Sequence, residues 1–250
     1  MTPFDQHTAF QTMQGDIVPA ITAAEMRDVD RIAVQDFGLS VLQMMENAGR
    51  SLALHAMQLC RRSGRILIFA GSGGNGGGGM ACGRHLHNHG YQVAVVLAKD
   101  PDSFSEATAH QHHTLSKAGV EIHPAAPANS LLEQTALVID ALIGYSLNGE
   151  PRGAVKVLIQ EANASSLPVL ALDVPSGIEA STGRSPGVSI VPTRTLTLAL
   201  PKTGLRGLPG RLFLADIGIP SNLYKQIGLE PGPIFSGDYS VELQSTDDTV

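Results

Sequence analysis

Tryptophan is absent from the 250-residue chain, and aromatic residues make up only 4% of it. Without aromatic side chains on which bases can stack, we expect no platform for single-stranded nucleic acid. Positive charge is also scarce: 17 lysines and arginines against 23 aspartates and glutamates give a net charge of −6. The longest basic run is Arg61–Arg62. Because such a chain repels phosphate backbones, the sequence predicts no nucleic-acid partner.

Cysteine and long apolar segments are equally scarce. The two cysteines, Cys60 and Cys82, cannot form a disulfide framework, and each lies among apolar residues, where a free cysteine is usually a small buried hydrophobe. No apolar stretch approaches the length of a membrane span, and the first 16 residues lack the basic region and apolar run of a signal peptide. We therefore predict a cytoplasmic protein with no membrane partner.

Apolar residues, in contrast, make up 43% of the chain, which is enough for a buried core. A length of 250 residues suits one sizeable domain and is short for two. We predict a domain over residues 19–222, preceded by a loose N-terminal extension over 1–18. Beyond it the chain becomes rich in proline and glycine and then acidic and polar, which predicts a C-terminal tail over 223–250.

Apolar periodicity predicts two helices at the start of the domain, within 21–38 and 40–59, the second capped by Ser40. From Arg65 the pattern changes to short apolar runs separated by helical segments. Continuous apolar strands that alternate with helices indicate a mostly parallel sheet covered on both faces. We therefore predict an α/β fold with extra N-terminal helices. The predicted strands lie within 65–70, 92–98, 120–124, 136–144, 168–173, 193–202 and 211–220.

A run of glycines follows the first of these strands, AGSGGNGGGGMACGRHL over residues 70–86. It contains G-x-G-x-x-G in Gly71, Gly73 and Gly76, and we predict a loop here with a helix from Met80 onward. In that context, backbone N–H groups at a helix start hold a phosphate. No Lys-Ser/Thr pair follows, so the loop is not a Walker A motif. The acidic residue expected about 20 positions later is unconvincing, which argues against a plain NAD oxidoreductase.

Carboxylates end two otherwise apolar strands, Asp140 in ALVID and Asp173 in VLALD. Burial of an unpaired carboxylate costs free energy, so we expect each aspartate to face a cleft, a cation or a hydrogen-bonding loop. The structural alternative is that each side chain caps the turn that follows its strand. Asn75, Asp140 and Ser176 offer only oxygen ligands. This set suits a hard cation such as K⁺, Mg²⁺ or Ca²⁺ and not zinc.

Taken in order, several segments resemble the YjeF N-terminal domain family, which is related to apolipoprotein A-I-binding protein and whose enzymatic members are NAD(P)HX epimerases. The resemblance extends from about Ile21 to Pro220. It implies a Rossmann-like three-layer α/β/α sandwich that binds hydrated NADH or NADPH. Such a domain interconverts the R and S forms at carbon 6 of the ring, so that a dehydratase partner can restore NAD(P)H. A homodimer is also implied. The segments are MENAG (45–49), the glycine run, DALIGYSLNGEPR (140–152), LDVPSGIEASTG (172–183), TLALPKTGL (197–205) and ADIGIP (215–220).

The resemblance also implies a site, in which one K⁺ per subunit is held by Asn75, Asp140 and Ser176. We expect Asp173 to bind substrate and to act as the acid/base at carbon 6. The chain departs from the family pattern NNGGDG at Gly74 and Gly78, which replace an asparagine and an aspartate, and Glu179 replaces an aspartate. The other implied substrate-binding residues are Gly74, Asn75, Gly76, Gly77, Gly78, Gly144, Tyr145, Ser146, Leu147, Asn148, Gly149 and Glu150.

Several alternatives stay open at this stage. The chain could be a non-catalytic nucleotide-sensing or protein-interaction module on the same fold. Lys202 could pair with a substrate phosphate, although a solvated surface lysine is commoner, and Glu46 and Asn47 could face the cleft or bond within their helix. The histidines near residues 85–89 and 110–113 lack a third metal ligand and predict hydrated helix faces.

Overall fold

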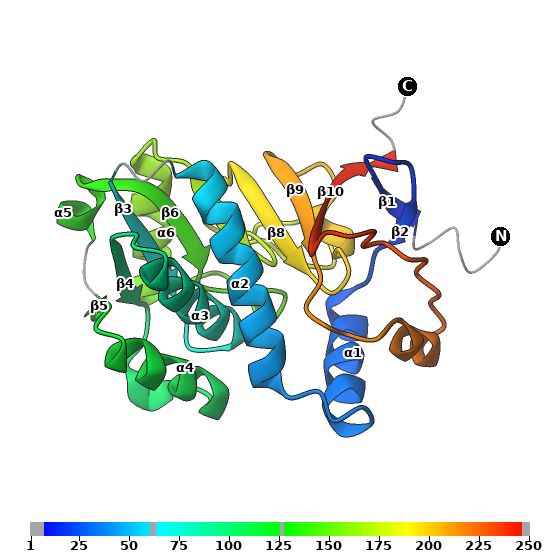
Figure 1. Ribbon diagram of the computed structural model, residues 1–250. Helices are drawn as coiled ribbons and strands as arrows, with labels where there is room; N and C mark the ends of the chain where they lie inside the picture. Colours follow the sequence, from blue (N-terminus) through cyan, green and yellow to red (C-terminus); the bar gives the residue numbers. More distant parts are fainter. Residues whose placement is uncertain (1–7, 61–63, 126–127, 247–250) are drawn as a thin grey trace.

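A computed structural model describes residues 8–60, 64–125 and 128–246 of the chain (Figure 1). Within these residues it contains one ten-stranded sheet, in the order β2-β1-β10-β9-β8-β7-β6-β3-β4-β5. Its strands are β1 (Thr8–Thr12), β2 (Ile17–Pro19), β3 (Arg65–Ala70), β4 (Val93–Leu97), β5 (Glu121–His123), β6 (Thr135–Ala141), β7 (Val169–Leu172), β8 (Arg194–Leu198), β9 (Arg211–Ala215) and β10 (Ser240–Ser245). Its helices are α1 (Ala23–Gln35), α2 (Val41–Leu59), α3 (Gly74–Asn88), α4 (Glu106–Lys117), α5 (Asn129–Leu132) and α6 (Gly153–Ala164), with short 3₁₀ turns that include η4 (Ser221–Ile227).

The strands from β5 to β9 run parallel, which confirms the predicted mostly parallel sheet. The chain passes from β3 outward through β4 to β5, and then returns to β6 and continues through β7 to β8 on the other side. The order therefore reverses between β3 and β6. In an open α/β sheet a ligand binds beyond the carboxyl ends of the strands at such a reversal. The fold thus places a crevice next to the glycine run and Asp140.

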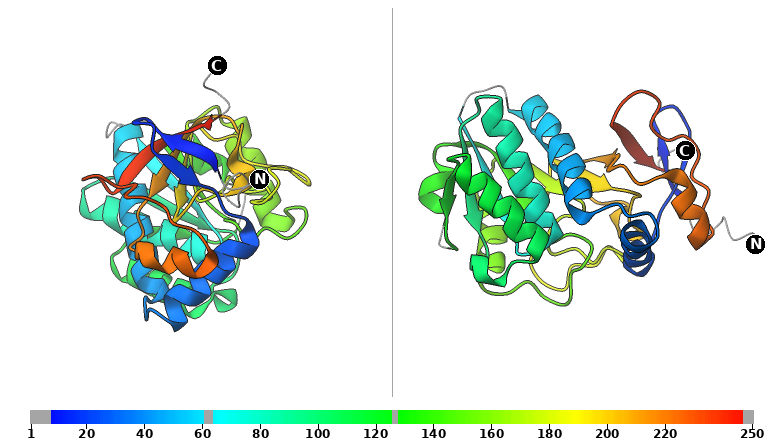
Figure 2. Two further views of the ribbon diagram at one scale, coloured as in Figure 1. Left: turned by 90° about the vertical axis from the view of Figure 1, so that its right-hand side faces the viewer. Right: turned by 60° about the horizontal axis from the view of Figure 1, so that its bottom comes forward.

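Helices cover both faces of the sheet, with α2, α3 and α4 on one face and α6 on the other (Figures 1 and 2). The side chains of β3 alternate between the two layers. Ile66 and Ile68 pack in the cluster that holds α2 and α3, whereas Leu67 and Phe69 pack in the cluster that holds α6. All four are fully buried. Burying an aliphatic or aromatic side chain of this size stabilises the fold by about 1.5–3 kcal/mol, so β3 is the centre of the core.

The two N-terminal helices begin where their capping residues lie. Thr22 caps α1 and Ser40 caps α2, each in a capping box with the residue three positions later. Because each box satisfies two backbone N–H groups at a helix start, it fixes the point at which the helix begins. The prediction of Ser40 as an N-cap is confirmed.

Helix α3 begins at Gly74, six residues before the expected start at Met80, so most of the glycine run is helical. Glycine is a poor helix former, which is why the sequence predicted a loop. The structure supplies the competing reason. A Cβ on Gly79 would lie 2.5 Å from the Cβ of Ala141, and one on Gly76 would lie 1.8 Å from the carbonyl oxygen of Gly71. Close approach of α3 to the strand ends therefore requires glycine.

The ends of the described chain are strands of the sheet, which corrects the loose extension over 1–18 and the tail over 223–250. Strand β10 pairs antiparallel with β9 and with β1, which in turn pairs with β2. Phe10 and Leu243 are buried there, so these strands bury apolar side chains in spite of their polar composition. Leu223 and Tyr224 of the predicted tail are buried as well. Residues 1–7 and 247–250 of the two segments, and Arg61–Arg62, lie outside the described residues. None of the described helices is long and apolar enough to cross a membrane.

Replacement of Gly76 by alanine is expected to destabilise the fold by about 1–3 kcal/mol, because the new methyl group meets a backbone carbonyl that cannot move aside. Gly74 is the matched control within the same run, since no atom lies within 4 Å of its would-be Cβ. Gly74→Ala should be neutral or stabilising by about 0.4–1 kcal/mol. Urea unfolding of both variants measures the difference. Equal midpoints would contradict the packing explanation of the glycine run.

Candidate active site

A cavity of about 290 Å³ lies between α1, α2, the first turn of α3 and the carboxyl ends of β7 and β8. Its apolar wall comes mainly from the methionines of α1 and α2, Met26, Met44 and Met45, with Leu172 and Ile217. Its polar groups are Asp30, Asn75, Tyr145, Ser146, Asp173 and Lys202. These polar groups come from five different segments of the chain, which meet at the crevice that the strand order predicts.

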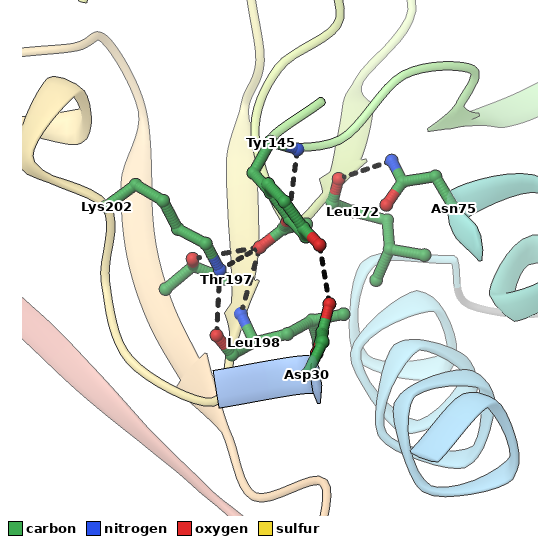
Figure 3. Close-up of polar contacts among 8 residues, drawn as sticks. Asp30, Asn75, Tyr145, Leu172, Thr197, Leu198 and Lys202 are labelled. Atoms are coloured by element: carbon green, nitrogen blue, oxygen red, sulfur yellow. Dashed lines mark hydrogen bonds and ion pairs between the residues drawn. The ribbon is translucent and has the colours of Figure 1, made fainter. Parts of the chain in front are cut away.

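The Asp173 carboxylate accepts hydrogen bonds from several groups of the site, among them Tyr145 and Lys202, which Figure 3 labels. Its Oδ1 accepts a hydrogen bond from the ammonium group of Lys202 in a buried ion pair, and the Lys202 side chain is 0% exposed. Its Oδ2 accepts from the backbone N–H of Tyr145 at 3.1 Å. Lys202 also donates to the carbonyl oxygen of Leu198 at 2.9 Å. Lys202 and the N–H of Tyr145 therefore both donate to Asp173, whose two oxygens act as acceptors.

The backbone of Asp173 is left-handed, with φ of +67°. Ala199, at the corresponding end of β8, is left-handed as well, with φ of +64°. This conformation costs a residue other than glycine of the order of 1 kcal/mol, and aspartate tolerates it better than most residues. Strained backbone at two adjacent strand ends is typical of a functional site, where the surrounding structure holds a side chain in one position.

Tyr145 reaches across the cavity to α1. Its hydroxyl lies 2.5 Å from Oδ2 of Asp30, and its ring lies 5.9 Å from the ammonium group of Lys202. Burial raises the pKa of Asp30, while the hydrogen bond from Tyr145 and the charge of Lys202 lower it. Burial and the negative charge of Asp30 raise the pKa of Tyr145. The site therefore holds two carboxylates in different environments, one paired with a cation and one bonded to a phenol.

Asn75, in the first turn of α3, points toward the segment after β6. Its amide nitrogen donates to the carbonyl oxygen of Leu172 at 2.9 Å. A Cβ on Gly144 would lie 2.7 Å from Oδ1 of Asn75 and 2.9 Å from Oδ2 of Asp173. Only glycine at position 144 leaves room for both side chains. Because the side-chain nitrogen of Asn75 is hydrogen-bonded to Leu172, its Oδ1 is the atom left to face the cavity that Asn75 lines.

Asp140 and Ser176 lie beneath the cavity in direct contact. The Ser176 hydroxyl donates to Oδ1 of Asp140 at 2.6 Å, and the Ser176 backbone N–H donates to Oδ2 at 2.8 Å. The same hydroxyl accepts from the N–H of Ile143 at 2.9 Å. Ile143 precedes Gly144, so these bonds connect the Asp140–Ser176 pair to the glycine beside Asn75. The three oxygen-bearing residues thus come from three different segments of the same edge of the sheet.

Burial raises the pKa of Asp140 to about 6, although three hydrogen bonds oppose the shift. No ion pair compensates this carboxylate within the described chain, where its partners are Ser176 and the N–H of Leu142. An uncompensated buried carboxylate favours a bound cation nearby. No three histidine, cysteine, aspartate or glutamate side chains gather as a metal site anywhere in the described residues. The oxygen-only donors fit a hard cation better than a transition metal.

The expected substrate-binding residues divide into three groups. Gly74, Asn75, Gly78, Gly144, Tyr145, Ser146 and Asp173 line the cavity. Gly76 and Gly77 are buried by packing, with Gly77 against Met45. The segment from Leu147 to Glu150 does not line this cavity, and the exposed Glu150 bonds Lys156 at 2.8 Å.

Two cavity residues were missed or misjudged from the sequence. Lys202 is fully buried, so the expectation of a solvated surface lysine is wrong. Its charge is paired with Asp173, which lies 29 positions away in the chain. Asp30 was not anticipated at all. Its only signal is helical spacing, because it lies four residues after Met26 on a face that is otherwise apolar.

The MENAG segment contacts other elements through Glu46 and Asn47. Glu46 accepts hydrogen bonds from Arg84 and Gln111 and so joins α2 to α3 and α4. Asn47 donates to the carbonyl oxygen of Ile217 at 3.0 Å, which fixes the segment after β9. His85 lies 3.4 Å from Glu46 and is partly buried, so it does not belong to a fully hydrated helix face.

Residues 41–204 match the family model described as YjeF-related protein N-terminus. An NAD(P)H-hydrate epimerase of Dehalogenimonas lykanthroporepellens is 45% identical over 245 residues, which cover 95% of this chain and 98% of the relative. The chain belongs to the YjeF N-terminal family. An epimerase of Rhodopirellula baltica is 31% identical over 85% of this chain and 89% of its own length. The resemblance inferred from the motifs is therefore confirmed.

The chain is also similar to part of a longer relative and to a solved structure. A bifunctional NAD(P)H-hydrate repair enzyme of Hyperthermus butylicus is 39% identical over 86% of this chain, which matches 41% of that longer relative. The crystal structure of the yeast protein ynu0 superposes with a TM-score of 0.79 at 24% identity, covering 90% of this chain and all of the yeast chain. The fold of the family therefore accounts for nearly all of the described structure.

Proposed function

We propose that the protein is an NAD(P)H-hydrate epimerase, an isomerase that interconverts the R and S forms of hydrated NADH and NADPH. The observation that carries the proposal is the buried Asp173 carboxylate, held in a left-handed conformation at the wall of a small cavity. Its relatives named as epimerases are similar over nearly their whole length. A carboxylate fixed in a pocket is what a reaction through a cation requires.

The size of the cavity indicates which part of the substrate enters it. A volume of about 290 Å³ is at the lower end for ligand pockets, which are about 300–1,000 Å³. One ring and its ribose fit this volume, whereas a complete dinucleotide does not. The exposed Gly73 and Gly74 leave the start of α3 open beside the cavity. Backbone N–H groups there suit the diphosphate, so the hydrated ring would point inward toward Asp173.

Epimerisation requires the bond between carbon 6 and its hydroxyl oxygen to break and form again. Departure of the hydroxyl leaves a positive charge shared between carbon 6 and the ring nitrogen. A carboxylate about 4 Å from such a charge stabilises it by about 4 kcal/mol at an effective dielectric constant of about 20. Lys202 offsets part of this attraction, because it already pairs with Asp173. Water that returns to the opposite face of the planar cation inverts carbon 6.

We also propose one potassium ion per subunit, held by Asn75, Asp140 and Ser176. The buried Asp140 without an ion pair and the cavity-facing Oδ1 of Asn75 support this assignment. When bound, the ion would supply positive charge beside the substrate phosphates. The chain's own residues provide the remaining contacts: Asn75 holds the Leu172 carbonyl, and Ser176 positions Ile143 before Gly144.

The functional partner would be an NAD(P)H-hydrate dehydratase, because epimerisation alone restores no NAD(P)H. Relatives named as bifunctional repair enzymes are more than twice as long as the matched segment, which supports a second activity acting beside the first. A homodimer and a cytoplasmic location remain predictions from the sequence resemblance. The substrate preference between the NADH and NADPH hydrates is part of the same proposal.

Asp173→Asn should lower the rate of epimerisation by about 10²–10⁴-fold, the usual loss when a charged catalytic group is removed. Asparagine also tolerates a left-handed backbone, so the variant tests charge rather than conformation. Proton NMR of purified S-form hydrate, with and without protein, measures the interconversion. The matched control is Asp216→Asn, which removes a carboxylate after β9 at the same edge of the sheet. Full activity in Asp173→Asn would remove Asp173 from the mechanism, and an inactive wild type would favour the non-catalytic module.

Potassium should raise the melting temperature of the wild-type protein above its value in choline chloride at equal ionic strength. At 100 times its dissociation constant, a ligand of the native state adds about 2.7 kcal/mol of stability. Asp140→Asn should lose the difference between the two salts, because it removes the only negative ligand. Differential scanning fluorimetry measures both proteins. Identical melting temperatures of the wild type in the two salts would contradict the potassium site.

A further inference from the structure

The cavity contains a second carboxylate that the proposed reaction does not yet use. Asp30 comes from the middle of α1 and is separated in the sequence from every segment named in the proposed mechanism. It contacts Tyr145 across the cavity, and both residues line the same space as Asp173 and Lys202. Figure 3 shows the Tyr145 hydroxyl directed to Asp30. The backbone N–H of Tyr145 donates to Asp173, so Tyr145 contacts both carboxylates.

The hydroxyl that leaves carbon 6 needs a proton, and Asp173 is poorly placed to supply it. Both of its oxygens accept hydrogen bonds, and Lys202 holds it as an ion pair. Lys202 itself is fully buried and divides its contacts between Asp173 and the Leu198 carbonyl. Asp140 is also unsuitable, because it lies beneath the cavity with its oxygens bonded to Ser176 and Leu142.

We propose that Asp30 and Tyr145 form a proton relay, in which Tyr145 exchanges a proton with the hydroxyl at carbon 6 and Asp30 positions and recharges the phenol. This inference rests on the proposed epimerase function. It rests on three observations: the 2.5 Å contact between the two side chains, their shared position on the cavity wall, and the donors from Lys202 and the Tyr145 backbone that already occupy both oxygens of Asp173.

The proton balance closes over one epimerisation. As the bond between carbon 6 and oxygen breaks, its electron pair leaves with the oxygen, which takes the Tyr145 proton and departs as water. The proton of the Asp30 carboxyl moves to the phenol oxygen, and the ring retains the positive charge. When water adds to the other face, it forms the new carbon–oxygen bond and releases a proton to solvent. A proton then returns from solvent to the Tyr145–Asp30 pair, so that both residues regain their starting state. No oxidant or further reactant is needed.

The environment of Asp30 favours a carboxyl that keeps its proton more readily than an exposed one. Burial is the largest cause of its raised pKa, and the charge of Asp173 acts in the same direction, whereas the Tyr145 hydrogen bond and Lys202 oppose them. The other groups that face the pair are Tyr224 from η4, which interacts electrostatically with Asp30, and Arg27 on α1, which interacts with Tyr145. Two carboxylates whose environments differ in this way divide the roles of acid and charge stabiliser.

The test uses Asp30→Asn and Tyr145→Phe, each of which keeps the size of its side chain. Each should lower kcat for epimerisation by about 10²–10⁴-fold with little change in KM, and the double variant should be about as slow as either single one. The wild-type kcat should fall on the alkaline side as Asp30 loses its proton, and Asp30→Asn should lack that alkaline fall. A residue with a merely structural role would not alter the pH profile.

Asp28→Asn is the matched control, because it removes a carboxylate from the same helix at an exposed position that pairs only with Arg31. It should retain wild-type activity. If Asp30→Asn and Tyr145→Phe both react within about threefold of an active wild type, the relay is wrong while the epimerase function stands. An unchanged alkaline fall in Asp30→Asn would also overturn the relay. If the wild type fails to accelerate interconversion, the proposed function falls first, and the relay falls with it.

Discussion

The buried ion pair between Lys202 and Asp173 determines how the cavity is built. A fully buried lysine is tolerated only when its charge is compensated, so the segment after β8 must follow the strand end that carries Asp173. Asp173 in turn holds the N–H of Tyr145, and Tyr145 reaches Asp30 on α1. A single charge pair therefore connects β7, β8, the segment after β6 and the N-terminal helix around one small space.

The bare start of α3 is the second constraint on the site. Glycines at 76 and 79 let the helix approach the strand ends, and that approach brings Asn75 beside Gly144. Position 74 differs, because it is open, and its lack of a side chain leaves room at the helix start. The run thus combines dense packing on the side facing the sheet with an open, exposed helix start at Gly73 and Gly74. This division explains why one stretch of sequence contains so many glycines.

The sequence predicted the parallel sheet well, because apolar strands and helices have distinct periodicities. It also identified Asp140 and Asp173, since carboxylates at the ends of apolar strands are conspicuous. It did not predict the helical start at Gly74, where tertiary packing overrides the low helix propensity of glycine. Asp30 was missed, and the burial of Lys202 was not expected, because each is explained by a partner distant in the chain. The strands β1, β2 and β10, at one end of the sheet, were missed because their polar residues resemble those of unstructured ends.

The account requires the hydroxyl at carbon 6 to leave as water and to be replaced from solvent within this cavity. Mass spectrometry of S-form hydrate incubated with the protein in ¹⁸O-labelled water tests that requirement most directly. We predict that each molecule converted to the R form carries one solvent-derived oxygen, and that Asp173→Asn slows conversion and incorporation equally. Conversion to the R form without incorporation of the label would contradict the account.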